Sequence, residues 1–485
     1  MNIIEKRISA LLLILLSILS FFIFVIFFSF YFVLNPNYEF FNIGIFISII
    51  IYNSLYAILL FNDKNITYIL FSPLFWYKFI STLFFGIGPL AYYFGSSITI
   101  EVMNLYFFTS SETISKIALI YLTSIVLTDS ILLILNYLSP LPSQLSVKFT
   151  NKKLLLFYSL TIGIFFKYII IIPSSLLGIN APGISHAFPP FIYIGIFLAY
   201  NIGQKNSSYK ILFYILTFIE ASSSFLVLSK EYLYMLIMFS AFTVFFHNKN
   251  LKTILITGLA SGVLYIFVIQ NLFLVLRSAG DGSFGITSTT EIESAFETIR
   301  GGAVVNGQNV ASFEAWWDRL SYVKYQAYAV EAYDQNYPGK TLQNFKYIFI
   351  PRILYPEKPN LNPGSEYNSL VQQSFSEQNP NSTGPGIFVE AYWNGGWLYL
   401  IYVTIYFSFL LFYTSKIIVK NLKEKNYVIL MFAVNAVYIG RSIDSWFVGT
   451  YGGLILNMTV VYFFSFAIYK GLESILNTKN MRLNE

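Results

Sequence analysis

The run ISALLLILLSILSFFIFVIFFSFYFVL, residues 8–34, is the stretch that decides the fold class. It carries no charge, and it follows a short basic segment, residues 1–7, without a small-residue cleavage site. A signal peptide has an apolar core of about 7–15 residues, whereas crossing a bilayer takes about 20. The run therefore predicts an uncleaved first membrane helix.

The composition of the whole chain agrees with this start. Hydrophobic residues make up 56% of the sequence and charged residues 11%, and the mean hydropathy is +0.62. Soluble domains carry about 25% charged residues, so we expect an integral membrane protein. The chain has no cysteine and two histidines, which excludes a disulfide framework and argues against a structural zinc site.

Apolar segments at regular intervals predict an all-α protein with about twelve transmembrane helices. The expected spans are 8–34, 41–61, 71–95, 114–138, 154–172, 188–203, 211–229, 231–247, 253–276, 397–415, 428–447 and 450–469.

Lys and Arg residues concentrate in alternate short connections, such as 148–153 and 416–425, whereas 35–40 and 173–187 contain neither. The positive-inside rule then places both termini in the cytoplasm. Lys116 and Lys167 are exceptions, because they fall toward the outer ends of their spans.

One long polar segment, residues 277–396, interrupts the apolar runs. We expect helices 1–9 in residues 1–276, an extracytoplasmic loop domain in 277–396, and helices 10–12 with a cytoplasmic tail in 397–485. The loop has eight Lys and Arg against twelve Asp and Glu, so the positive net charge of +6 lies elsewhere in the chain. That distribution is a topology signal, and it predicts no nucleic-acid partner.

The loop itself is expected to be mostly helical and to cover the membrane domain. Apolar residues at helical spacing predict a helix over 310–334 and a second helix that Thr341 caps and Pro351 limits. A short amphipathic helix is expected over 365–375.

Charged residues inside or beside the spans are candidates for function, because charge in a membrane is costly. Several cations fall toward the outer ends of spans or in the loop, where they could bind the diphosphate of a lipid headgroup and stabilise it as a leaving group. They are Arg277, Arg352, Arg441, Lys230 and Lys358. Ordinary alternatives are that Arg441 and Asp444, three apart on one helix, neutralise each other, and that Lys230 and Arg277 extend to the interface.

Glu390 is the candidate general base, since it lies in a Gly- and aromatic-rich turn before a span and could accept a proton from a sugar hydroxyl. The alternative is a helix-terminus cap. Tyr392, Trp393 and Trp397 could stack on sugars, although aromatics are also common at membrane interfaces. His186 is the alternative base.

Two passages resemble the bacterial oligosaccharide repeat-unit polymerases, the O-antigen polymerases of the Wzy type. IPRILYPEKP (350–359), followed by Gly364, resembles the family's pattern of an Arg, an aromatic-proline run, Lys-Pro and a Gly. GIFVEAYWNGGWLYL (386–400) resembles its entry into the next helix. LVLSKEYLYML (226–236) has Lys230 where many members have an Arg.

The resemblance implies a metal-independent, cofactor-free membrane glycosyltransferase with a GT-C-like architecture in the bacterial inner membrane. Donor and acceptor would be undecaprenyl-diphosphate-linked oligosaccharides, polymerised on the outer face into O-antigen or capsule. Further partners would be membrane lipid, a chain-length regulator and a flippase.

Three alternatives remain. The related O-antigen ligases share the layout, whereas a lipid-linked oligosaccharide flippase or transporter would explain Lys78, Asp129 and Glu220 in the interior of their spans. A structural membrane protein leaves Arg352 and its surroundings unexplained.

Overall fold

The structure is a computed structural model. It describes residues 3–33, 37–61, 66–104, 109–138, 151–177, 183–226, 230–248, 260, 262–263, 304–305, 308–309, 317, 320–350, 354–361, 363–372 and 383–482. Almost all of the described secondary structure is helical. The exception is a pair of two-residue antiparallel strands, β1 (Val304–Val305) and β2 (Gln308–Asn309).

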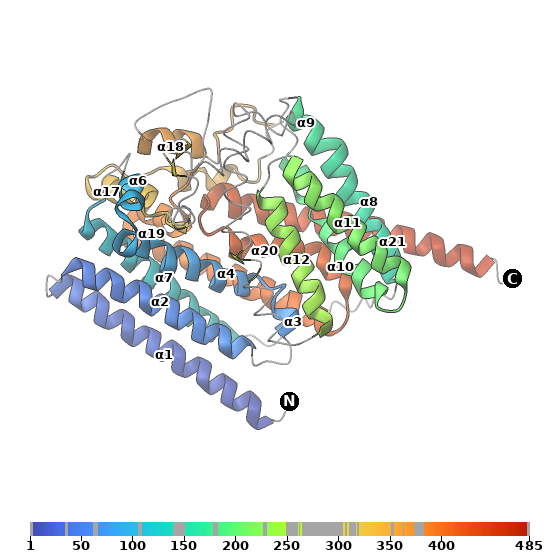
Figure 1. Ribbon diagram of the computed structural model, residues 1–485, viewed down its shortest axis with the longest axis horizontal. Coiled ribbons are helices and arrows are strands. Elements are labelled where there is room, and N and C mark those ends of the chain that lie inside the picture. The colour runs from blue at the N-terminus through green and yellow to red at the C-terminus, as the bar shows by residue number, and fades with distance from the viewer. Residues whose placement is uncertain are drawn as a thin grey trace. The chain divides into compact units, whose positions relative to one another are not determined.

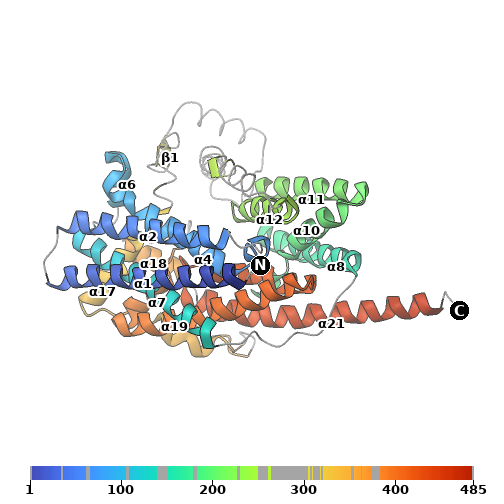
Figure 2. The same cartoon turned by 90° about the horizontal axis from the view of Figure 1, so that it is seen from below.

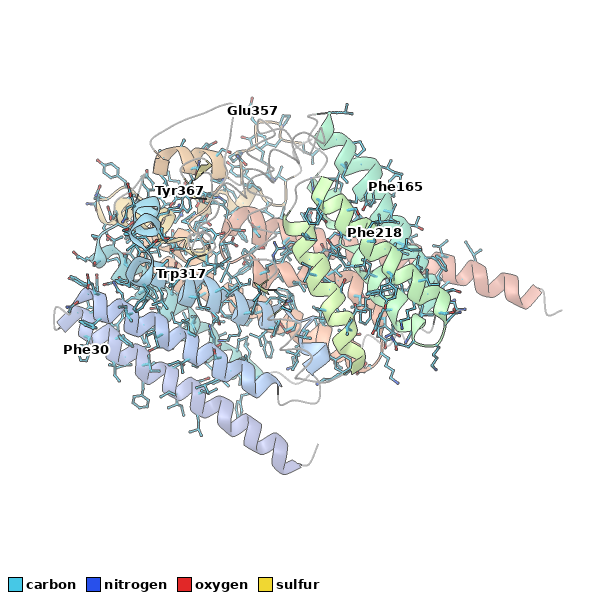
Figure 3. The ribbon with its side chains drawn as sticks, viewed as in Figure 1. Phe30, Phe165, Phe218, Trp317, Glu357 and Tyr367 are labelled. Carbon is cyan, nitrogen blue, oxygen red and sulfur yellow. The ribbon has the colours of Figure 1, made fainter. Side chains whose placement is uncertain are left out.

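Eight of the described helices or helix runs are long and apolar enough to cross a membrane. They are Leu15–Phe32, Tyr38–Ala57, Pro73–Phe94, Ser111–Leu138, Lys152–Ser174, Gly183–Gly203, Ile387–Lys423 and Phe447–Ile475. Each overlaps a predicted span, so the prediction of a multi-pass helical membrane protein is confirmed. Large apolar side chains such as Phe30, Phe165 and Phe218 are exposed on the helices (Figure 3), as lipid-facing residues are.

The other four predicted spans have different outcomes. The segments 211–229 and 231–247 correspond to helices α11 (Ser207–Leu226) and α12 (Lys230–Asn248), and 428–447 corresponds to the shorter α20 (Leu430–Arg441). The segment 253–276 lies outside the described residues apart from positions 260, 262 and 263. The count of twelve spans therefore stays a prediction.

The chain divides into two compact units, and we describe each by itself. The first consists of Met1–Ser143, Glu314–Ile417 and Val437–Ile455. In it, α1 (Ile3–Val33), α2 (Tyr38–Phe61) and α7 (Ser111–Leu138) pack side by side (Figure 1).

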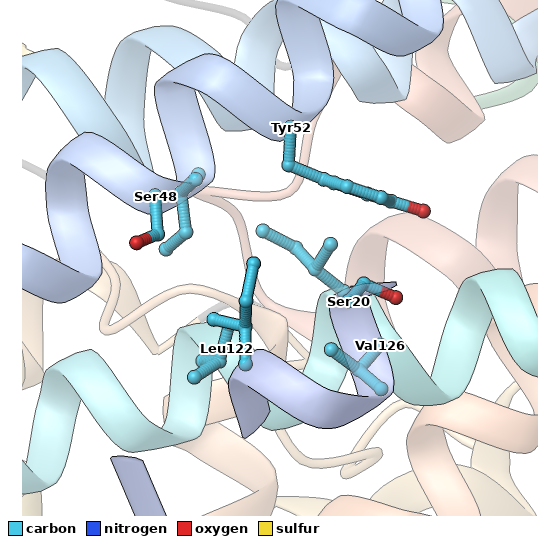
Figure 4. A pocket seen from close by; sticks show the side chains of 8 residues that line it. Ser20, Ser48, Tyr52, Leu122 and Val126 are labelled. Atoms are coloured by element: carbon cyan, nitrogen blue, oxygen red, sulfur yellow. The ribbon is translucent and has the colours of Figure 1, made fainter. Parts of the chain in front are cut away.

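A small cavity of about 10 Å³ lies between α1, α2 and α7 (Figure 4). This volume is at the lower limit for one water molecule. The lining is mostly apolar and consists of Ser20, Ile23, Ser48, Ile49, Tyr52, Leu122, Ile125 and Val126. The cavity is therefore a packing defect, too small for a sugar or a lipid chain.

The third span of the first unit is a run of short helices, Pro73–Phe94. Pro73 at the first helical position and the Ser72 side chain, which accepts from the Phe75 amide, start α4. A Cβ at Gly440 would lie 1.9 Å from the Pro73 carbonyl oxygen, so glycine is required where α20 crosses α4. The remaining elements of this part are α3 (Ile66–Ile69), α4 (Pro73–Ser81), η1 (Thr82–Ile87), η2 (Gly88–Leu90), α5 (Ala91–Phe94) and α6 (Ser97–Asn104).

The long helix α19 (Ile387–Lys423) is broken at Gly395 and Gly396. Gly396 has φ 61°, and a Cβ there would lie 2.5 Å from the Tyr333 hydroxyl, so only glycine fits. The predicted start of a span at Trp397 coincides with this break. The helix nevertheless begins ten residues earlier, because the residues from Ile387 to Asn394 form helical turns of their own, of which Ile387 to Tyr392 are buried.

The predicted loop helices differ in detail from the structure. The last part of the helix expected over 310–334 is α17 (Val323–Asp334). Positions 317 and 320 are also helical, Ser321 and Tyr322 are not, and the other residues of 310–319 lie outside the described residues. Thr341 begins η6 (Thr341–Tyr347), a 3₁₀ helix, but the capping position belongs to Lys340 and Thr341 bonds elsewhere. The expected amphipathic helix is α18 (Gly364–Gln372).

The second unit consists of Gln144–Phe313, Ile418–Ala436 and Leu456–Glu485. Its central helix is α10 (Phe191–Gly203), whose residues from Phe191 to Ala199 are all buried against α8, α11 and α12 (Figure 2). Its other elements are α8 (Lys152–Ile164), η3 (Phe165–Ile171), α9 (Ile172–Leu176), η4 (Gly183–Ala187) and η7 (Tyr427–Ile429). The last described span consists of η8 (Phe447–Gly452), which belongs to the first unit, and α21 (Gly453–Arg482), whose residues from Leu456 onward belong to the second.

Among the described residues, each unit has a buried Lys–carboxylate pair between its helices. In the first unit, Lys78 Nζ lies 2.5 Å from Asp129 Oδ2, and the side chains are 3% and 2% exposed. The Tyr52 hydroxyl donates to the same oxygen, and the ammonium lies 4.6 Å from the centre of the Tyr56 ring. Each charge is therefore neutralised by the other.

The pair in the second unit is built in the same way. Lys167 Nζ lies 2.5 Å from Glu220 Oε2, the Tyr168 hydroxyl donates to Glu220 Oε1, and the ammonium lies 4.4 Å from the Tyr232 ring centre. Lys167 was one of two exceptions to the predicted orientation. The other, Lys116, pairs with Asp334 at 2.5 Å. Both exceptions are thus lysines with a carboxylate partner.

The orientation predicts that the turn after α17 and the carboxyl-terminal end of α19 lie on opposite sides of the membrane. A reporter inserted after Asn336, in the turn that follows α17, is expected to be extracytoplasmic, and one inserted after Asn426 cytoplasmic. Alkaline phosphatase and green fluorescent protein fusions measure the two sides. Equal signals from the same reporter at both positions would contradict the orientation.

The buried pair predicts a large cost when one charge is left alone. Asp129→Asn should destabilise the protein by about 3–5 kcal/mol, because Lys78 would keep its charge in the membrane interior without its counterion. The Lys78→Met/Asp129→Leu double variant should regain most of the loss. Thermal unfolding in detergent measures all three proteins.

Lys116→Met is the matched control, since it breaks a half-exposed pair with side chains 23% and 34% exposed. Its expected cost is about 1 kcal/mol or less. An Asp129→Asn protein as stable as the wild type would show that the buried pair is not required.

Candidate functional site

Glu390 occupies the first turn of α19, where the chain enters the membrane domain. The preceding residues 383–386 form no regular secondary structure, and Gly386 has φ 78°, which a side chain would strain. The Ile387 amide then donates to the Ile443 carbonyl at 3.0 Å, which fixes the helix start against the segment between α20 and η8.

Both carboxylate oxygens of Glu390 accept hydrogen bonds. The Thr341 hydroxyl donates to Oε1 at 2.5 Å, and the Phe447 backbone amide donates to Oε2 at 2.6 Å. The side chain is 0% exposed. Phe447 is the first residue of η8, so the carboxylate caps the start of the last span, where an anion is stabilised by the helix dipole.

Asn394 extends this arrangement by one helical turn. Its Nδ2 donates to the Thr341 hydroxyl and to the Glu390 carbonyl, each at 2.9 Å, and its Oδ1 accepts from the Leu342 amide at 3.0 Å. Glu390, Asn394, Thr341 and Phe447 form what we call the Glu390 junction. It joins the polar segment to two membrane helices.

The prediction that Glu390 lies in a flexible turn is wrong, because the flanking glycines frame a helix. Its carboxylate is buried among protein donors, which is the geometry of the capping alternative. A base role stays a prediction. The sequence contained one signal for the junction, the four-residue spacing of Glu390 and Asn394 on one helix face.

The described part of the polar segment is fixed to the membrane helices by α17. Gln326 accepts from the Tyr121 hydroxyl, Glu331 accepts from the Thr113 hydroxyl at 2.8 Å, and Asp334 pairs with Lys116. All three contacts are to α7. We did not expect these residues from the sequence, because each contact joins positions more than 200 residues apart.

Helix α18 packs on α17 through Tyr367. Its hydroxyl donates to the Tyr325 carbonyl, and its ring lies 5.2 Å from that of Trp446 and 5.4 Å from that of Trp393. Burial, together with Tyr328 and Glu390 nearby, raises the pKa of the Tyr367 hydroxyl well above its usual value. The hydroxyl therefore remains protonated and able to donate.

The three predicted sugar-stacking residues contact protein. Tyr392 donates to Asp334 at 3.0 Å and lies 5.4 Å from the Trp397 ring. Trp393 donates to the Tyr337 carbonyl at 3.2 Å. Tyr392 is buried, whereas Trp393 and Trp397 keep partly exposed rings beside the junction.

Arg441 and Asp444 are near the junction but do not share a helix. α20 ends at Arg441, so the two residues do not share a helix face, and their mutual neutralisation stays a prediction. Asp444 accepts from the Tyr322 hydroxyl at 2.8 Å, and the Arg441 guanidinium lies 5.1 Å from the Tyr438 ring centre. Arg441 therefore lies at the end of α20, in the first unit.

The other predicted site residues do not lie in a single unit of the structure. Lys358 donates to the Ile350 carbonyl at 2.9 Å in the first unit. His186, exposed in η4, and Lys230, the first residue of α12, belong to the second unit. Arg277 and Arg352 lie outside the described residues. A convergence of all five cations stays a prediction.

Within the described residues, no group of three or more His, Cys, Asp or Glu side chains could hold a metal ion. Independence from metals is left to experiment. A comparison with protein-family models, characterised proteins and solved structures finds no match to this chain. The geometry of the Glu390 junction and the resemblance of the two sequence passages therefore indicate the function.

Because Glu390 caps the start of η8, we expect substitution by alanine and by glutamine to have different effects on the stability of the protein. Glu390→Ala should destabilise the protein by about 1–3 kcal/mol, because the Phe447 amide would be buried without an acceptor. Glu390→Gln should stay close to the wild type, since its amide can accept from Phe447 and donate to Thr341. Thermal unfolding in detergent measures both. Glu366→Ala, on the exposed face of α18, is the control and should change little. Equal losses for alanine and glutamine would contradict the capping role.

Proposed function

We propose that this chain polymerises undecaprenyl-diphosphate-linked oligosaccharide repeat units into O-antigen or capsule on the outer face of the bacterial inner membrane. The proposal includes twelve spans, a GT-C-like architecture, and transfer without a metal or cofactor. Its partners would be the lipid-linked donor and acceptor, with a chain-length regulator and a flippase.

One observation supports the proposal most. The passage GIFVEAYWNGGW, on which the family resemblance partly rests, forms the buried junction between the polar segment and the membrane helices. A transferase acting on lipid-linked sugars needs its polar segment fixed beside the lipid headgroups. The Glu390 junction supplies a rigid attachment of that kind.

In the proposed reaction, an acceptor hydroxyl attacks the anomeric carbon of the donor sugar. The bond from that carbon to the diphosphate oxygen breaks, and undecaprenyl diphosphate leaves with the electron pair. Cations such as Arg352 and Arg441 would stabilise the charge that develops on the leaving group. Glu390 would accept the hydroxyl proton, provided that the Thr341 hydroxyl moves away from Oε1.

A flippase or transporter is the second candidate, and the two buried Lys–carboxylate pairs favour it. Transporters place charged residues near the middle of the membrane. In both pairs, however, the charges are already neutralised and bonded by tyrosines. A neutralised pair that is also hydrogen-bonded can have a purely structural role. The two pairs are therefore weaker support for transport than the Glu390 junction is for glycosyl transfer.

Reconstitution of the purified protein with lipid-linked repeat units tests the proposal. We expect a ladder of products on a gel, in the presence of excess EDTA as well as in its absence. Arg352→Ala should slow the reaction by about 10- to 150-fold, because one charge-assisted contact contributes about 1.5–3 kcal/mol. Arg352→Lys should lie between that variant and the wild type.

Arg482→Ala, at the end of α21, is the matched control and should form the normal ladder. Transfer to a different lipid without a ladder would indicate a ligase, and movement of the lipid without lengthening would indicate a flippase. In the same assay, a Glu390→Gln protein of full turnover would exclude Glu390 as the base.

A further inference from the structure

Residues 345–350 have apolar side chains on both faces. Phe345 and Ile348 point toward the protein, and Ile348 is 5% exposed. Phe349 and Ile350 are 68% and 36% exposed, and Leu354 beyond them is 76% exposed. A surface segment in water is normally polar on its outer face, so three large apolar side chains exposed within six residues need another explanation.

The inward contacts show at what depth this segment lies. The Phe345 ring centre lies 6.2 Å from that of Tyr406 in α19 and 6.2 Å from that of Phe447 in η8. A Cβ at Gly452 would lie 2.0 Å from Ile348 Cδ1. The segment therefore packs directly against two helices that are long and apolar enough to cross the membrane.

Tyr406 lies well inside its span. It is nine residues after Trp397, which corresponds to about 14 Å along the helix axis. Tyr399 and Tyr402, 41% and 59% exposed, lie between them, as aromatic residues do at a membrane interface. Gly452 is likewise beyond the first turn of the last span. Both helices place residues 345–350 on the membrane side of this aromatic level.

We propose that Phe349, Ile350 and Leu354 form a lipid-docking surface, occupied by acyl chains of the leaflet in which Trp397 lies. The polar segment would then be held from two sides, by the Glu390 junction on the protein and by this surface in the bilayer. Lys346, which is exposed, would reach the lipid phosphates from the same segment. The inference requires only a membrane protein, not a polymerase.

The natural sequence contains no cysteine, so a single introduced cysteine gives a unique label. The full-length Phe349→Cys and Leu354→Cys proteins would be labelled with an environment-sensitive fluorophore and placed in phosphatidylglycerol/phosphatidylethanolamine nanodiscs. We expect blue-shifted emission, quenching by brominated acyl chains, and little quenching by aqueous iodide.

Tyr337→Cys is the matched control. Its side chain is a large aromatic with 72% exposure, but its carbonyl accepts from Trp393, which follows Tyr392, a contact of Trp397 at the aromatic level. We expect iodide to quench this label and brominated lipid to leave it unaffected.

Quenching of the labels at 349 and 354 by iodide, at the level seen for 337, would overturn the proposal. Protection from both quenchers would also overturn it, because protein would then cover the surface. Thermal unfolding of each labelled protein confirms folding, and both positions tolerate substitution because they are exposed.

Discussion

The hydrogen bond from the Phe447 amide to the Glu390 carboxylate is the contact on which the rest of the first unit depends. It fixes the first residue of the last span to the first turn of α19. The second carboxylate oxygen fixes Thr341, and with it the start of η6. A buried anion at a helix start is stable only with donors on both oxygens, so the junction specifies the positions of three chain segments at once.

Charge inside the membrane obeys a similar constraint. A lysine in a span is tolerated when a carboxylate lies within contact distance, and Lys78, Lys116 and Lys167 each have one. Two of these lysines interrupt the otherwise regular asymmetry of the connections. Their pairing explains why the asymmetry still predicts an orientation: a neutralised lysine contributes little to the charge that the translocation machinery resists.

The sequence predicts well what depends on neighbouring residues. Apolar runs located eight described spans, because burying backbone in lipid requires helices. It predicts poorly what depends on distant residues. The partners of Glu390 lie 49 and 57 positions away, and no local pattern identifies them. The helix break at Gly396 could not be predicted for the same reason. The Tyr333 hydroxyl, which leaves room only for glycine at this position, is far away in sequence.

The burial of Glu390 limits the chemistry that this conformation can perform. A general base must contact the hydroxyl that it deprotonates, yet both oxygens are occupied and the side chain is fully buried. Glu390 cannot cap Phe447, bind Thr341 and accept a substrate proton in one arrangement. If transfer proceeds without rearrangement of the junction, stabilisation of the departing diphosphate must provide most of the acceleration, and cations such as Arg352 and Arg441 become the residues that matter most. If Glu390 is the base, the Thr341 contact is the one that opens, because the Phe447 contact maintains the fold of the last span.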